Sequence, residues 1–132
     1  MIYLDTNIFL YPQTGTDILS RACTILLEKA ANEEIEAGTS VLTWDEFNYA
    51  LRKKIGKLAA SEQSKLFLML PGIIFFPATK EVIAKAQEIV ELYRLDPRDA
   101  IHAATAILNK CDSIVSDDKD FDSVKGLKRI MP

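Results

Sequence analysis

The chain opens with MIYLDTNIFL at residues 1–10, an apolar stretch interrupted by one acid, Asp5. It predicts a short strand over Met1–Asp5, with the acid at its end. Apolar residues then recur at helical spacing from Thr16 to Ala31, which predicts an amphipathic helix. A strand followed by a helix is the first unit of an alternation that continues along the chain.

The remaining segments repeat this alternation. Further strands are predicted at Ile35–Thr39, Ile73–Phe76, Ser113–Ser116 and Leu127–Ile130. Further helices are predicted to begin at Thr43, Ser61, Thr79 and Pro97. The run Ile73–Phe76 is apolar throughout and lies between glycine and proline, which is typical of a buried strand. We therefore predict one α/β domain over residues 1–132, with a central, mostly parallel sheet and helices on both faces.

The composition excludes several classes of protein. The chain has 132 residues, of which 48% are hydrophobic and 27% charged, as in a soluble domain. No apolar run approaches the roughly 20 residues that span a bilayer, and no signal leader is evident. We expect Cys23 and Cys111 to be buried thiols, and the protein to be cytoplasmic with no membrane partner. A net charge of −3 argues against wrapping duplex DNA, but not against holding phosphate through metal ions.

Acidic residues fall at one end of the predicted elements. Asp5 ends the first strand, and Asp117 and Asp118 follow the strand that contains Ile114 and Val115. Glu46 and Asp99 lie in the first turns of two helices. In a parallel sheet, strand C-termini and helix N-termini share the edge where ligands bind. Carboxylates gathered there repel one another unless a cation binds, and Mg²⁺ and Mn²⁺ favour carboxylate ligands.

Each acid also has a purely structural explanation. The segment Thr43–Glu46 matches a capping box, in which the glutamate bonds the first backbone N–H of the helix. Asp99 is favoured by the positive end of its helix dipole. Asp117 and Asp118 are common turn residues. Several acids at one predicted edge favour a site over a set of unrelated structural roles.

Four segments resemble the motifs of PIN-domain ribonucleases, especially the VapC-type toxins of toxin–antitoxin pairs. They are MIYLDTNIFL at residues 1–10, TSVLTWDEFNYAL at 39–51, LDPRDAIHAATA at 95–106 and SIVSDDKDF at 113–121. In this resemblance Asp5, Glu46 and Asp99 take the family's first three acidic positions. The fourth motif aligns Asp118 with the last acid, and Asp117 stands beside it as an alternative.

The resemblance implies a PIN fold and an endoribonuclease that hydrolyses RNA with Mg²⁺ or Mn²⁺. Asp5, Glu46, Asp99 and Asp118 would be its catalytic, metal-binding acids. The resemblance also implies a homodimer and, for a toxin, a small antitoxin partner. The alternatives are a PIN nuclease of other RNA processing and a non-catalytic PIN-like module that binds RNA or protein. Retention of all four acids counts against the non-catalytic module.

Several other side chains are expected near the acids. Thr6 and Ser116 are candidates to hydrogen-bond the ligand carboxylates. His102, the only histidine, lies three residues after Asp99, and its alanine-rich surroundings favour packing over a role as general base. Three cationic side chains are candidates for RNA contact: Arg98, Lys119 and Arg52.

The helices from Thr43 to Ile55 and from Ser61 to Leu70 carry many large apolar residues. Every face of the run Leu66–Leu70 is apolar, which is typical of a helix that is buried all round or meets a partner. We therefore predict a homodimer that uses this region. The alternative is that one chain buries the whole run.

Overall fold

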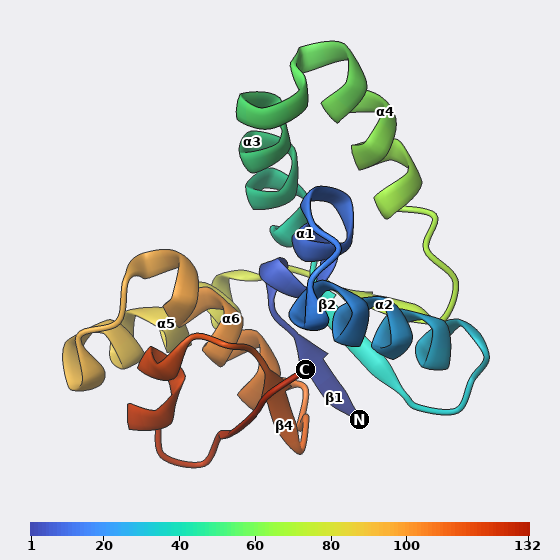
Figure 1. Ribbon diagram of the computed structural model, residues 1–132. Helices are drawn as coiled ribbons and strands as arrows, with labels where there is room; N and C mark the ends of the chain where they lie inside the picture. The colour runs from blue at the N-terminus through green and yellow to red at the C-terminus, as the bar shows by residue number, and fades with distance from the viewer.

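The computed structural model describes residues 1–132 and contains one sheet of five parallel strands (Figure 1). The strands are β1 (Ile2–Leu4), β2 (Ala37–Ser40), β3 (Ile73–Phe76), β4 (Ser113–Val115) and β5 (Lys128–Ile130). Their order in the sheet is β3-β2-β1-β4-β5. The chain builds outward from β1 to β3 and then returns to place β4 on the other side of β1. The winding of the sheet therefore reverses between β1 and β4.

Helices cover both faces of this sheet. They are α1 (Thr6–Thr14), α2 (Ile18–Ala31), α3 (Thr43–Ile55), α4 (Lys57–Phe67), α5 (Lys80–Tyr93), α6 (Pro97–Leu108) and the short 3-10 helix η1 (Lys119–Ser123). Figure 1 shows α5 and α6 on one side of β1 and α2 on the other, with α3 and α4 projecting together. The predicted α/β arrangement is confirmed.

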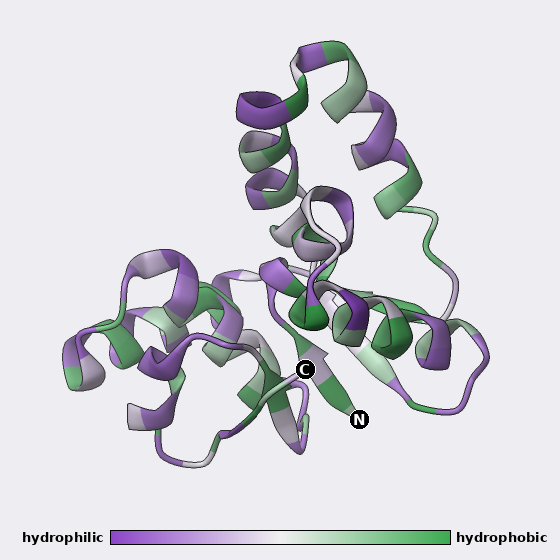
Figure 2. Ribbon diagram, viewed as in Figure 1, coloured by the Kyte–Doolittle hydropathy of each residue, from purple (hydrophilic) through white to green (hydrophobic).

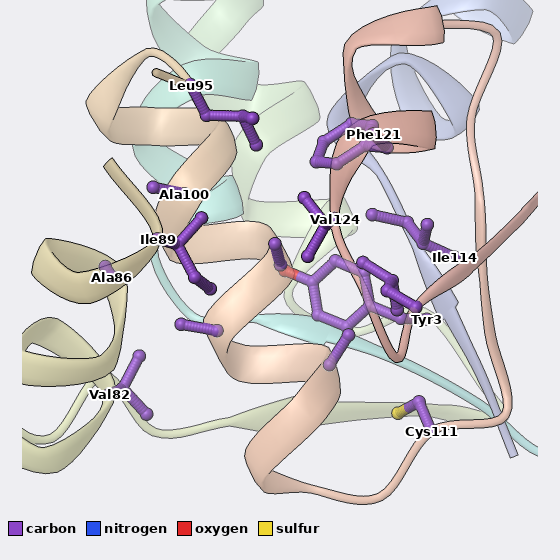
Figure 3. Close-up of a cluster of buried hydrophobic side chains, with 14 of the residues drawn as sticks. Tyr3, Val82, Ala86, Ile89, Leu95, Ala100, Cys111, Ile114, Phe121 and Val124 are labelled. Carbon is purple, nitrogen blue, oxygen red and sulfur yellow. The ribbon is translucent and has the colours of Figure 1, made fainter. Parts of the chain in front are cut away.

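Two hydrophobic cores lie on opposite faces of the sheet, because successive side chains of a strand point in opposite directions. Tyr3 and Ile114 belong to the core under α5 and α6, drawn in Figure 3. Leu4 and Val115 belong to the core under α1 to α4. In Figure 2 hydrophobic and hydrophilic residues alternate along the helices, as expected for elements buried on one face. Because both faces of β1 and β4 are buried, these strands hold the positions of the residues that follow them, Asp5 and Ser116.

Helix α4 begins at Lys57, so the prediction of a start at Ser61 is wrong. Gly56 has a φ of 85°, which favours glycine, and it turns the chain directly from α3 into α4. No capping side chain is needed at such a junction. The Ser61 hydroxyl was interpreted as a helix cap, but Ser61 lies inside α4. The helix also ends at Phe67 and does not continue to Leu70.

Strand β3 has the predicted bounds but not the predicted environment. It pairs only with β2 and forms an edge of the sheet. Ile74 is consequently 45% exposed, although Phe76 is buried. An unbroken apolar run could not reveal this difference, because an edge strand and a central strand share the same residue types.

The apolar run at Leu66–Leu70 is divided between core and surface. The Phe67 ring packs in the core against Phe9, Phe47 and Phe75. By contrast, Leu68 is 51% exposed and Met69 is 70% exposed. One chain therefore does not bury the whole run, and an apolar remnant stays at the surface.

Both cysteines, Cys23 and Cys111, are buried free thiols, as predicted. The model contains no helix with the length and apolar character needed to cross a membrane.

Candidate active site

The four predicted acids converge at the C-terminal edge of the sheet. Asp5 follows β1 and Asp118 comes shortly after β4, the two neighbouring strands between which the winding reverses. Glu46 and Asp99 lie in the first turns of α3 and α6. All four line one cavity of about 250 Å³. Its remaining walls come from Thr6, Asn7, Leu10, Tyr49, Ala50 and Arg98.

Asp5 is buried and held by two hydrogen bonds. Its carboxylate accepts one from the Thr6 backbone N–H (2.7 Å), at the start of α1, and one from Ser116 Oγ (2.7 Å). The Ser116 hydroxyl also accepts the Asp118 backbone N–H (3.0 Å). Burial raises the pKa of Asp5 in spite of these bonds. The contact expected between Ser116 and a carboxylate is therefore present, and it joins the loop after β4 to the first acid.

Glu46 does not form the capping box that its sequence permits. The Thr43 hydroxyl pairs with the Thr39 hydroxyl (2.7 Å), and no side chain caps α3. Glu46 Oε1 instead lies 2.6 Å from Nε2 of His102. Burial acts to raise the pKa of Glu46, but the hydrogen bond and charge of His102 outweigh it and lower the pKa. The structure thus removes the capping explanation and places an ionised carboxylate beside the cavity.

His102 is buried as expected, but it is not a simple packing residue. Its Nδ1 lies 2.6 Å from the Tyr3 hydroxyl, and its Nε2 lies 3.1 Å from Thr6 Oγ1 as well as against Glu46. Burial acts to lower the pKa of His102, but Tyr3, Glu46 and Asp5 outweigh it and raise the pKa well above 6.5. Burial agrees with the prediction that favoured packing over a role as general base, and the polar partners come from distant strand and helix residues that the sequence alone did not indicate.

Asp99 and Asp118 form a second part of the site, in which the carboxylates have fewer hydrogen-bond donors. Burial, together with the charges of Asp5 and Asp118, raises the pKa of Asp99 to about 6, and no hydrogen bond opposes the shift. Oxygens of Asp99, Asp118 and Asp120 lie within 4.8 Å of one another. Asp120 was not among the predicted acids. Its position two residues after Asp118, at the start of a turn of helix, was the available signal.

Asp117 does not line the cavity. Its Oδ2 accepts a hydrogen bond from the Tyr11 hydroxyl (2.6 Å), and its buried Oδ1 has no partner. Of the two adjacent aspartates, the structure brings Asp118 to the other acids and turns Asp117 towards α1.

The three cationic side chains expected to contact RNA occupy different positions around the cavity. Arg98 lines the cavity and lies 3.9 Å from Asp45, with its guanidinium 6.0 Å from the centre of the Tyr49 ring. Lys119 is exposed on η1, next to Asp118. Arg52 is exposed near the end of α3 and does not line the cavity.

The model of the PIN domain family matches residues 2–127. The chain belongs to the PIN domain family. The resemblance carried by the four sequence motifs is thereby confirmed. No curated protein sequence matches this PIN domain.

Solved structures of toxins share its fold. The structure of VapBC2 from Rickettsia felis, bound to a DNA fragment from its promoter, is 22% identical with a TM-score of 0.76 and covers 100% of this chain and 99% of that one. VapC20 from Mycobacterium tuberculosis, a sarcin-ricin loop cleaving toxin, is 17% identical with a TM-score of 0.78 over 100% of both chains. A toxin–antitoxin complex from Klebsiella pneumoniae is 21% identical with a TM-score of 0.72, over 100% and 98%. At these identities the likeness establishes the fold.

Proposed function

We propose that this PIN domain is an endoribonuclease that hydrolyses RNA phosphodiester bonds with Mg²⁺ or Mn²⁺. The observation that carries the proposal is the convergence of Asp5, Glu46, Asp99 and Asp118 on one cavity. Like charges so close together disfavour ionisation unless a cation joins them. A metal ion at this cavity would therefore relieve the repulsion and attract a phosphate group.

The donor atoms fit a hard divalent cation. They are carboxylate oxygens, the ligands that Mg²⁺ and Mn²⁺ favour, and the free thiols lie elsewhere. Asp5, Glu46, Asp99 and Asp118 would hold the ion, with Asp120 within reach of the last two. When bound, the ion would acidify a water molecule for attack and neutralise charge on the phosphate.

The protein's own cations would position the RNA. Arg98 borders the acids, and its guanidinium presents planar donors that match phosphate oxygens. Lys119 would add a positive charge beside Asp118. Arg52 would act farther along the RNA, at the basic end of α3.

A cleavage assay tests this proposal directly. Structured and single-stranded RNAs are incubated with the protein in Mg²⁺, in Mn²⁺ and in EDTA, with DNA of the same sequence as a second substrate. We expect metal-dependent cleavage of RNA that Asp99→Asn abolishes. Binding of RNA without cleavage in either ion would favour the non-catalytic module.

We also propose that the protein is the toxin of a toxin–antitoxin pair, with a small antitoxin as its partner. Support comes from the structures with the same fold, which include toxin–antitoxin complexes that match almost end to end. We expect expression in a bacterial host to arrest growth, and Asp99→Asn to restore it. Normal growth at protein levels that cleave RNA in vitro would favour a non-toxin RNA-processing nuclease.

We propose that two copies pair through apolar side chains of α3 and the end of α4. The exposed members of this surface are Trp44, Tyr49, Leu66, Leu68 and Met69. Met69→Glu is the appropriate test, because Phe67 lies in the core and its loss would cost about 3–5 kcal/mol of stability. Light scattering at micromolar concentration should show a parent dimer and a monomeric variant. A monomeric parent would end the dimer proposal.

A further inference from the structure

A buried chain of polar groups leads to Glu46. The Ser40 backbone N–H donates to the Tyr3 hydroxyl (3.0 Å), which lies 2.6 Å from His102 Nδ1. Nε2 of the same ring lies 2.6 Å from Glu46 Oε1 and 3.1 Å from Thr6 Oγ1. The chain thus runs from β2 through β1 and α6 to an acid on α3.

The proton on Nε2 follows from the partners of the ring. A carboxylate that binds a metal ion is ionised and only accepts hydrogen bonds, so the 2.6 Å contact then requires that Nε2 carry a proton in either charge state of His102. The Tyr3 hydroxyl both donates and accepts, so it pairs with Nδ1 whether or not that nitrogen is protonated. The hydrogen bond to Glu46 is therefore maintained in both charge states.

The Tyr3 ring is a rigid support for His102. Figure 3 shows it packed within the hydrophobic core among Ile114, Val124 and their neighbours. It is fully buried on the central strand β1, and its ring meets the imidazole edge to face at 5.6 Å between centroids. Rotation of the imidazole, or displacement of the Tyr3 hydroxyl, would break hydrogen bonds in a region closed to water, where an unsatisfied polar group is costly.

We propose that His102 is a positioning residue, held by Tyr3, that fixes the Glu46 carboxylate in the geometry that binds the metal ion. This inference rests on the proposed metal-dependent function. A role as general base does not fit, because His102 is 1% exposed and both ring nitrogens already have partners. Nε2 of the ring lies 3.6 Å from Asp5 Oδ1 but 2.6 Å from Glu46 Oε1, so the ring acts on the ion mainly through Glu46, as hydrogen-bonded partners of metal ligands commonly do.

The experiment measures Mn²⁺ affinity by calorimetry, separately from RNA cleavage. His102→Leu removes the contacts of the ring with Tyr3, Glu46 and Thr6 at similar volume, and we expect Mn²⁺ binding to weaken about 10- to 100-fold. His102→Gln keeps an N–H donor directed at Glu46 and should recover most of the affinity. Tyr3→Phe removes the hydroxyl that supports the imidazole and accepts the Ser40 N–H, but it leaves the contact between His102 and Glu46, so it should give an intermediate loss.

A double-mutant cycle separates positioning from a general effect on the fold. If His102 acts only through Glu46, His102→Leu should weaken Mn²⁺ binding no further in the Glu46→Gln background. Additive losses, parent-like affinity in His102→Leu, or equal losses in the Leu and Gln variants would overturn the inference. Should His102→Leu fail to fold, the comparison of His102→Gln with Tyr3→Phe decides, and parent-like affinity in Tyr3→Phe counts against it.

Two further measurements complete the design. Thr105→Val is the matched control, since Thr105 is buried on the same helix and bonds only the Ile101 carbonyl, so it should bind Mn²⁺ like the parent. A parent that binds Mn²⁺ without cleaving RNA would overturn the ribonuclease proposal alone. A parent that binds no Mn²⁺ would overturn both proposals.

Discussion

The two parts of the acidic cavity differ in how the protein supports their charge. Asp5 and Glu46 accept hydrogen bonds from Ser116, from a backbone N–H and from His102. Asp99 has no such donor, and its pKa is raised to about 6 by burial and by neighbouring charges. Asp118 accepts one hydrogen bond, from the Asp120 backbone N–H. Side-chain donors thus orient Asp5 and Glu46, although burial raises the pKa of Asp5 as well, whereas no donor reaches Asp99.

This difference indicates that the two groups of acids have different roles. Hydrogen bonds to a carboxylate orient it before any ligand arrives. Repulsion among carboxylates destabilises the fold until a cation joins them. Substitutions in both parts should consequently lower activity, but only substitution of Asp99 should raise the stability of the metal-free protein.

The largest effect is expected from Asp99→Asn and Asp5→Asn. Both should lower the rate of RNA cleavage by on the order of 100-fold or more, the scale of losing a group that stabilises transition-state charge. In EDTA, Asp99→Asn should raise the melting temperature because it removes repulsion. Asp5→Asn should not, since an amide has one acceptor oxygen for two hydrogen-bond donors. Parent-like cleavage in both variants would refute the assignment of the site.

Glu46→Gln is a milder substitution in the part of the site that contains Asp5 and Glu46. The amide keeps an oxygen that accepts the His102 N–H but loses the charge, so cleavage should fall by about 10- to 100-fold, as for other disturbed metal sites. The melting temperature in EDTA should change little. Cleavage at the parent rate would mean that the carboxylate serves the fold alone.

Metal binding should stabilise the parent protein by neutralising the charge around Asp99, which has no hydrogen-bond donor. Mn²⁺ at 100 times its dissociation constant should add about 2.7 kcal/mol to the free energy of unfolding. Thermal melts with a Mn²⁺ series measure this gain, and Asp99→Asn should reduce it. An equal gain in parent and variant would place the ion away from Asp99.

The last effect is a pH dependence of the free energy of unfolding in EDTA. The pKa of Asp99 is about 6 in the folded protein and 3.8 in its ordinary state. Between these values the folded chain holds more protons, so its contribution to stability falls as pH rises from about 4 to about 6 and stays low above. Melts across this range should show a steeper downward trend in the parent than in Asp99→Asn. Identical slopes would contradict the raised pKa.

Local patterns were sufficient for most of the elements and for the four acids. Thr79 caps α5 and Pro97 begins α6 as predicted, because caps and prolines act within one turn of helix. Helix α3 also begins at Thr43 as predicted, but the residues there were equally consistent with a capping box and with a site role for Glu46. The Thr43 hydroxyl binds Thr39 on a neighbouring strand, and only the folded chain brings these two groups together.

The sequence by itself determined the alternation of strands and helices, and with it the edge at which Asp5, Glu46, Asp99 and Asp118 meet. Tertiary structure alone decided which way each side chain turns there. It directed Asp117 to Tyr11, placed Phe67 in the core, and set His102 between Tyr3 and Glu46. The physical reason is range: periodicity and capping depend on residues within a few positions, whereas these contacts join residues 20 to 106 positions apart.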